Sequence, residues 1–242
     1  MQPKQEFDSF FDLYALDQNY VRNKNISYLK TDTHVGNAIK LGRYWEPWMF
    51  KYISENYIPN TNMIDLGANI GTTTLLMSEV LSKNQKIYSF EPIYHNVLFK
   101  NVIDNNLRNK TEIYPFGVGN KKQILKIRQI DFSKNNNFGA VSIIRTLDTN
   151  ETALSIQIIP VDDFNFENVS LIKIDVEHME IEVLEGCLDL LTRCKPTILL
   201  ETYQIDKLKT TDIFKKLINI GYDINPISEG HFDFIMKCTS PK

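Results

Sequence analysis

From residue 62 onward, short runs that favour β-strands alternate with longer segments of helical periodicity. The strand-like runs include NMIDLG at 62–67, KIYSFEP at 86–92, LIKIDV at 171–176 and TILLET at 197–202. Each is followed by a stretch of roughly 10–15 residues whose apolar positions recur at helical spacing. Because a helix between two strands makes the strands parallel, the alternation predicts an α/β fold with a doubly wound, mostly parallel sheet.

The flanking and inserted segments carry weaker patterns. Residues 1–60 contain two helical patterns, at about Glu6–Leu16 and Trp45–Asn56, and predict an N-terminal helical extension. Residues 61–242 then form a single α/β domain. Within it, KKQILKIRQI and GAVSIIRTL at 121–147 predict a hairpin insertion with asparagine-rich turn residues, and YDINPI and HFDFIMKC predict a terminal hairpin.

Composition argues against a nucleic-acid or membrane partner. Lysine and arginine total 27 against 30 aspartates and glutamates, a net charge of −3, so there is no basic excess to bind phosphates. No apolar run approaches the ~20 residues that a membrane-spanning helix needs. The cysteines, Cys187, Cys194 and Cys238, lack zinc-ligand spacing and are typical of reduced thiols. We therefore expect a cytoplasmic protein, with a homodimer left open.

The first strand-to-helix turn, DLGANIGTT at 65–73, is the first candidate ligand site. Ligands of open α/β sheets bind at the carboxyl ends of strands, where the strand order reverses. Gly67 and Gly71 allow the backbone to turn sharply or approach a ligand closely. Their G-x-x-x-G spacing differs from the dinucleotide pattern G-x-G-x-x-G. Thr72 is placed to cap the helix that follows.

Two acidic residues indicate which ligand this turn would take. Asp65, at the strand end, disfavours a pyrophosphate and suits a cation such as an amino group. Glu91, at the end of the next strand, can accept the hydroxyl hydrogens of a ribose. S-adenosylmethionine (SAM) has a ribose, an ammonium and no phosphate, and it satisfies these observations together. The alternative is a tight turn that binds nothing.

At this point the sequence resembles the FkbM-type SAM-dependent methyltransferases. The resemblance rests on GRYWEP, MIDLGANIGTTTLL, YSFEPIYHNVLFKNV, VDDF and LIKIDVEHMEIEVLEG, and covers about residues 42–205. It implies a class I methyltransferase fold of Rossmann-like type: a seven-stranded sheet whose last strand, HFDFIMKC, inserts antiparallel. It also implies methyl transfer, usually to a hydroxyl oxygen of a sugar or natural product.

The resemblance further implies which residues bind the cofactor. The first turn would line the methionine half of SAM, and Glu91 would hold its ribose. Glu46 would approach the amino-acid end from the N-terminal helix, and the adenine contact would come from around Phe116 and Gly117. The residues of the first turn are Asp65, Gly67, Asn69 and Gly71.

The fourth strand motif, LIKIDVEH, carries the candidate catalytic residues. In this fold its end lies beside the methyl group, and the family's usual motif has glycine where this chain has His178. A side chain with a pKa near neutrality is an efficient base for an acceptor hydroxyl. We expect that role for His178, or failing it for Asp175 or Glu177. The alternative is that Glu177 and Glu180 merely begin the next helix.

Several readings remain open from the sequence. Asp175, Glu177, His178 and Glu201 could ligate Mg²⁺, but carboxylates are common at strand ends and a metal is not favoured. The leading hypothesis is an O-methyltransferase whose partner is a small-molecule or glycan acceptor. The alternatives are a methyltransferase acting on RNA or nitrogen, a SAM-binding module or partner subunit without catalysis, and an NAD-dependent dehydrogenase.

Overall fold

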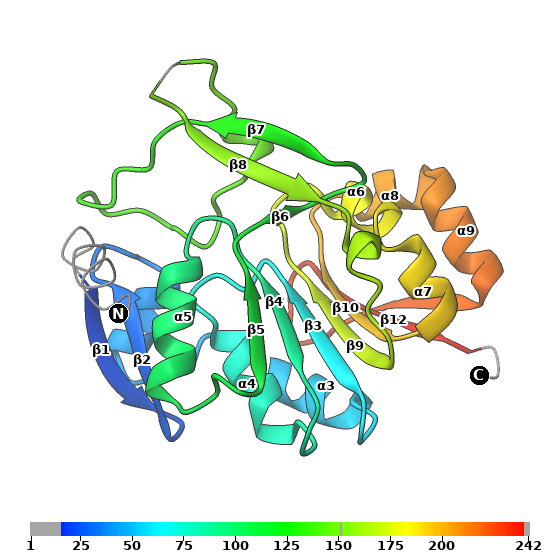
Figure 1. Ribbon diagram of the computed structural model, residues 1–242, viewed down its shortest axis with the longest axis horizontal. Coiled ribbons are helices and arrows are strands. Elements are labelled where there is room, and N and C mark those ends of the chain that lie inside the picture. The colour runs from blue at the N-terminus through cyan, green and yellow to red at the C-terminus, as the bar shows by residue number, and fades with distance from the viewer. Residues whose placement is uncertain (1–15, 151, 240–242) are drawn as a thin grey trace, which may run out of the picture.

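A central seven-stranded sheet organises the chain in the order β11-β12-β10-β9-β3-β4-β5 (Figure 1). The computed structural model describes residues 16–150 and 152–239. Strands β3, β4, β5, β9 and β10 are parallel, and β12 inserts antiparallel between β10 and β11, which confirms the predicted fold and terminal hairpin. The strands are β3 (Asn62–Leu66), β4 (Ile87–Phe90), β5 (Thr111–Tyr114), β9 (Val169–Ile174), β10 (Thr197–Glu201), β11 (Tyr222–Pro226) and β12 (Asp233–Cys238).

Helices cover both faces of this sheet. Consecutive side chains of a strand point to opposite faces, so Met63 joins one hydrophobic cluster and Ile64 the other. Burial on both faces is the reason that these strands are continuous apolar runs in the sequence. The Met63 side is covered by α3 (Met49–Asn56), α4 (Thr72–Val80) and α5 (His95–Asp104), and the Ile64 side by α6 (Glu180–Glu185), α7 (Leu188–Cys194), α8 (Ile205–Thr210) and α9 (Asp212–Ile220).

The N-terminal segment differs from the expected pair of helices. It forms a hairpin of β1 (Leu16–Val21) and β2 (Lys24–Leu29), followed by α2 (Val35–Lys40). The helix expected at 6–16 lies outside the described residues except for Leu16, which begins β1. The helix expected from Trp45 begins at Met49.

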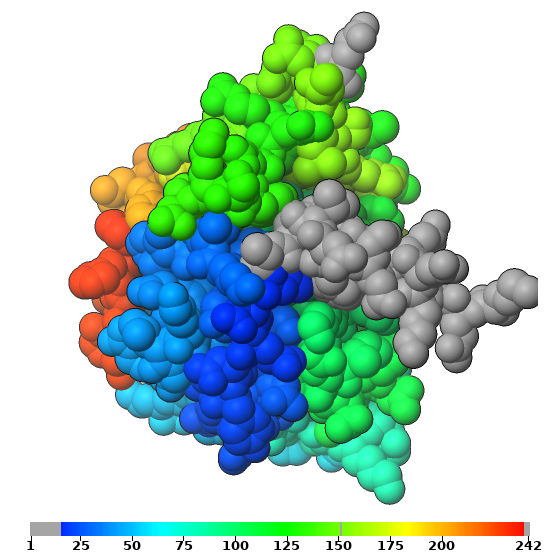
Figure 2. Space-filling view, turned by 90° about the vertical axis from the view of Figure 1, so that its left-hand side faces the viewer, coloured from blue at the N-terminus to red at the C-terminus, as the bar shows by residue number. Residues whose placement is uncertain are grey.

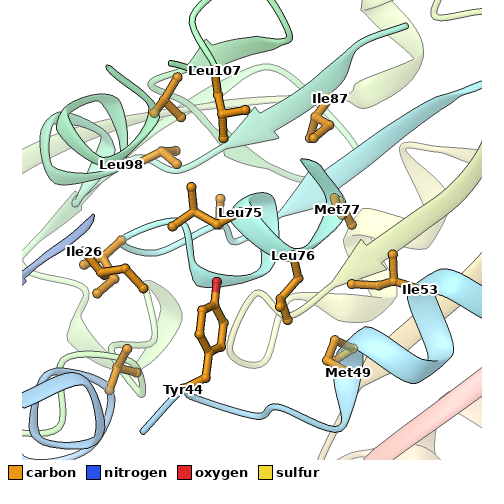
Figure 3. Close-up of a cluster of buried hydrophobic side chains, with 14 of the residues drawn as sticks. Ile26, Tyr44, Met49, Ile53, Leu75, Leu76, Met77, Ile87, Leu98 and Leu107 are labelled. Carbon is orange, nitrogen blue, oxygen red and sulfur yellow. The ribbon is translucent and has the colours of Figure 1, made fainter. Parts of the chain in front are cut away.

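This N-terminal segment packs into the core of the sheet domain. Ile26, Tyr44 and Ile53 surround Leu75 and Leu76 of α4 (Figure 3). The Tyr44 hydroxyl also donates a hydrogen bond to the Thr72 carbonyl at 2.6 Å. In the space-filling view the segment, in blue, covers one face of the molecule below the green insertion (Figure 2).

A second, three-stranded sheet lies beyond the carboxyl ends of β4 and β5 (Figure 1). It contains β6 (Gly117–Val118), β7 (Gln123–Ile127) and β8 (Leu154–Ile159). The predicted partner of β7 is correct only at one position. GAVSIIRTL contains a 3₁₀ turn at Ile144–Thr146 and meets β7 in a single antiparallel bridge between Ile127 and Leu147, whereas the strand that pairs with β7 along its length is β8. None of the helices in the two described ranges combines the length and apolarity needed to cross a membrane.

Candidate functional site

The turn between β3 and α4 packs directly against the end of β9. Gly67 has a φ of 79°, and a Cβ on it would lie 1.7 Å from the carbonyl oxygen of Asp175. Only glycine allows these two backbones to approach so closely. Gly71, with a φ of 95°, is the N-cap of α4, so the predicted capping by Thr72 is not formed and Thr72 is the first helical residue.

The Glu91 carboxylate organises the same turn. One of its oxygens accepts the backbone N–H of Asn69 at 2.9 Å, and the other accepts those of Ile93 at 2.7 Å and Tyr94 at 3.0 Å. Burial raises the pKa of Glu91, and these three N–H groups oppose the rise. The side chain predicted to hold a ribose therefore also holds the turn.

Two adjoining cavities lie at the carboxyl ends of the strands. The larger has a volume of about 940 Å³ and the smaller about 60 Å³. Asn69, Gly139, Asp175 and Glu177 line both. Glu91, Phe116 and Gly117, which were expected around the ribose and adenine, line the smaller cavity, together with the apolar side chains of Phe90, Ile93, Val118, Ile143 and Met179. The boundary between the cavities is thus formed by the turn and by the end of β9.

Asp65 does not face either cavity. Its side chain is fully buried, and Oδ2 accepts a hydrogen bond from the Thr74 hydroxyl at 2.6 Å. Oδ1 has no hydrogen-bond partner and lies 4.0 Å from Nζ of Lys173. The expected ammonium-binding role therefore lacks structural support at this residue. Gly71 also lies outside both cavities.

Carboxylates gather on one wall of the larger cavity. Oxygens of Glu46, Glu201 and Asp233 lie within 4.8 Å of one another. Burial, and then the nearby Asp175, raise the pKa of Glu46 to about 7 and that of Asp233 to about 6. Asp175, and then burial, raise the pKa of Glu201 well above its usual range. This group has the spacing to hold a cation, and it shares only Glu201 with the set that was weighed for Mg²⁺ from the sequence.

Of the predicted catalytic residues, Asp175 and Glu177 line the cavities and His178 does not. Burial, and then Asp175, raise the pKa of Glu177 to about 7. His178 has a φ of 78°, a backbone conformation that glycine adopts more readily than other residues, and burial lowers its pKa. The Glu180 carboxylate accepts the His178 backbone N–H at 2.7 Å, and Glu180 is the first residue of α6. The helix-start alternative therefore holds for Glu180, whereas Glu177 precedes the helix and lines the cavities.

An aromatic pair on the larger cavity was not predicted from the sequence. Tyr203 and Phe232 are 50% and 45% exposed, and their ring centroids are 4.3 Å apart. Tyr203 follows β10 and Phe232 precedes β12, so both lie at the ligand-binding edge of the sheet. Their positions beside strand ends were the signal available in the sequence.

Comparison with known proteins shows the family of the chain. Residues 65–224 match the family model described as the methyltransferase FkbM domain. The chain is similar in structure to the methyltransferase FkbM from Methylobacillus flagellatus KT, with a TM-score of 0.50, 18% identity and 77% of this chain covered. It spans about half, 49%, of that protein. This structural similarity shows that the two chains share a fold.

Two further solved structures are less similar. Precorrin-6y C5,15-methyltransferase from Geobacter metallireducens GS-15 has a TM-score of 0.44 and 13% identity, with 78% of this chain and 84% of that one covered. The tRNA m1G37 methyltransferase from M. jannaschii has a TM-score of 0.46 and 13% identity, with 92% and 53% covered. None of the curated proteins matches the sequence significantly.

Proposed function

The chain belongs to the FkbM methyltransferase family, and from this premise we propose that it transfers a methyl group from SAM to a hydroxyl oxygen of a small acceptor, most simply a sugar or a glycan. The observation that carries the proposal is the position of Asp175 and Glu177 at the boundary of the two cavities. There they can face a cofactor on one side and an acceptor on the other.

The residues around the smaller cavity fit the nucleoside half of SAM. Apolar side chains suit the faces of an adenine ring, and the Glu91 carboxylate suits ribose hydroxyls. The volume of about 60 Å³ is well below the roughly 300–1,000 Å³ of most ligand pockets, so the lining must open to admit the nucleoside. The methionine half would pass Asn69 toward the larger cavity.

The mechanism requires alignment and the removal of one proton. When bound, SAM supplies an electrophilic methyl group. The walls of the larger cavity hold the acceptor so that its hydroxyl oxygen is in line for displacement. Glu177, whose pKa is about 7, accepts the hydroxyl proton. Asp175 orients the acceptor through a hydrogen bond from the same or a neighbouring hydroxyl.

Several features support a sugar-like acceptor. The volume of about 940 Å³ is within the range of small-molecule sites. Its carboxylates accept hydrogen bonds from hydroxyl groups, and the Tyr203–Phe232 pair offers aromatic surface to the apolar face of a ring. A cytoplasmic location is part of this proposal and is supported by the free thiols of Cys187, Cys194 and Cys238.

Calorimetry followed by an acceptor screen tests the proposal. We expect micromolar binding of S-adenosylhomocysteine (SAH) and no binding of NAD. Labelled SAM should then methylate hydroxylated sugars, tested with Mg²⁺ and with a chelator because of the acidic wall. Binding of SAH without transfer to any sugar would oppose the sugar proposal and favour a binding module. Transfer to RNA that weakens with salt would favour the RNA alternative.

A further inference from the structure

Lys173 lies buried at the junction of β3, β9 and the first turn. Its backbone is paired with that of Asp65 across the two strands, and the residue is 5% exposed. Nζ lies 2.8 Å from Oδ2 of Asp175 and 4.0 Å from Oδ1 of Asp65, and donates a hydrogen bond to the Gly67 carbonyl at 3.2 Å. Within residues 16–150 and 152–239, it is the only buried lysine or arginine.

The charge on Lys173 is maintained by its surroundings. Burial by itself lowers the pKa of a lysine, but the carboxylates of Asp175 and Asp65 outweigh this effect and raise the pKa of Lys173. Carboxylates from several neighbouring strands and loops surround the positive charge. Those acids are Asp65 in β3, Glu91 after β4, Asp175 and Glu177 after β9, Glu201 in β10, Asp233 in β12 and Glu46 before α3.

We propose that Lys173 is a positioning residue of the cofactor site, which holds the Gly67 carbonyl and the Asp175 carboxylate in a single arrangement. The inference rests on the proposed function, because it takes the cofactor to bind along the Gly67 turn. Gly67 and Asp175 already touch through their backbones. Lys173 adds the side-chain connection, so the turn and the boundary between the cavities keep one relative position.

Loss of the ammonium group would release both of its partners. Asp175 would lose its 2.8 Å ion pair and would be repelled by Glu46 and Glu201 on the neighbouring wall. Asp65 would keep a buried oxygen with neither a hydrogen bond nor a cation nearby. Because an unpaired buried carboxylate is costly, the turn would have to rearrange.

Binding of SAH to Lys173→Met measures the effect directly. The methionine side chain fills a similar space without the charge. We expect SAH affinity to fall by at least about tenfold, because a charge-assisted hydrogen bond contributes more than a neutral one. Lys86→Met is the matched control, since that lysine is partly exposed and pairs with Glu112 at the far end of β4. It should bind SAH like the wild type.

Two further variants separate positioning from general stability. Lys173→Arg retains the charge and should bind SAH more tightly than Lys173→Met. Asp175→Asn removes the carboxylate that pairs with Lys173. Its SAH affinity tests the same ion pair if Lys173→Met does not fold. In the double variant the two losses should not multiply, because both remove one interaction.

The outcomes distinguish this inference from the function on which it rests. A folded Lys173→Met that binds SAH as tightly as the wild type would overturn the positioning role alone. So would losses that multiply in the double variant, or a Lys173→Arg variant no better than Lys173→Met. A wild-type protein that does not bind SAH would overturn the proposed function, and this inference with it.

Discussion

The carboxylate of Glu91 accepts the backbone N–H of Asn69 at 2.9 Å, which joins the end of β4 to the turn that follows β3. Asn69 has a φ of 51°, so the residue that donates this hydrogen bond has a left-handed backbone conformation. A side chain expected to bind the cofactor is thus part of the support for the turn. Cofactor binding and local stability are coupled at this residue.

Glu91→Gln should weaken both properties. The amide keeps one acceptor oxygen and replaces the other with a donor, which leaves at least one N–H of the turn unsatisfied. We expect the free energy of unfolding to fall by about 1–3 kcal/mol and SAH affinity to fall at least about tenfold. Denaturant unfolding and calorimetry measure the two effects. Unchanged SAH affinity in a folded variant would contradict the role of Glu91.

Gly67→Ala should destabilise the protein more than Gly42→Ala. Both glycines have positive φ, at 79° and 71°, but a Cβ at position 42 would meet nothing within 4 Å. Gly42→Ala therefore measures the conformational cost alone, about 1–2 kcal/mol. Gly67→Ala adds the clash with the Asp175 carbonyl and should also abolish SAH binding. Equal unfolding free energies for the two variants would show that the contact is easily relieved.

His178→Gly should stabilise the protein and retain activity. A non-glycine residue with a φ of 78° has a strained backbone. Relief of this strain, minus the entropy cost of glycine, should raise the free energy of unfolding by up to about 1 kcal/mol. His178→Ala removes the imidazole but keeps the strain, so it should be active without the gain. Thermal unfolding and methyl transfer separate the two. If both variants lose transfer at an unchanged SAH affinity, His178 is the base after all.

Preference for SAM over SAH should increase with pH. Glu46 and Glu177 have pKa values of about 7 and Asp233 about 6, all raised chiefly by burial. They are mostly protonated at pH 5.5 and ionised at pH 8, so the cavities become more negative as pH rises. The sulfonium of SAM is positive and SAH lacks that charge, so the ratio of the SAH to the SAM dissociation constant should rise severalfold.

The variant Glu177→Gln provides the control for this pH effect. Removing one of the titrating carboxyls should flatten the rise in the ratio. A ratio that is constant between pH 5.5 and pH 8 would mean that the sulfonium lies away from the acidic wall.

Tyr203→Ala and Phe232→Ala should each raise the KM for the acceptor without changing SAH affinity. Loss of one aromatic contact predicts an increase of about threefold to tenfold. Tyr20→Ala is the control, because Tyr20 is 62% exposed on β1 and lines neither cavity. Weaker SAH binding in the two cavity variants would place the pair at the cofactor instead.

Local sequence was sufficient for the architecture of the sheet. The strands are short apolar runs bounded by turn residues, and the helices between them require parallel neighbours. Contacts between distant segments were harder to predict. The strand that pairs with β7 is β8, which lies beyond GAVSIIRTL in the chain. GAVSIIRTL and β8 both contain the apolar residues that a strand needs, so periodicity could not show which of the two pairs with β7.

The sequence by itself determined the fold class, the glycines of the turn and the acidic residues at the ends of the strands. Each of these depends on residues adjacent in the chain and on the regular geometry of strands, helices and the turns between them. Only the tertiary structure decided what those acids face. The register that sets Asp65 opposite Lys173 buries one carboxylate under the turn, while Asp175 and Glu177 line the cavities. Burial and charge depend on residues that the fold brings together from distant positions, and no local pattern records them.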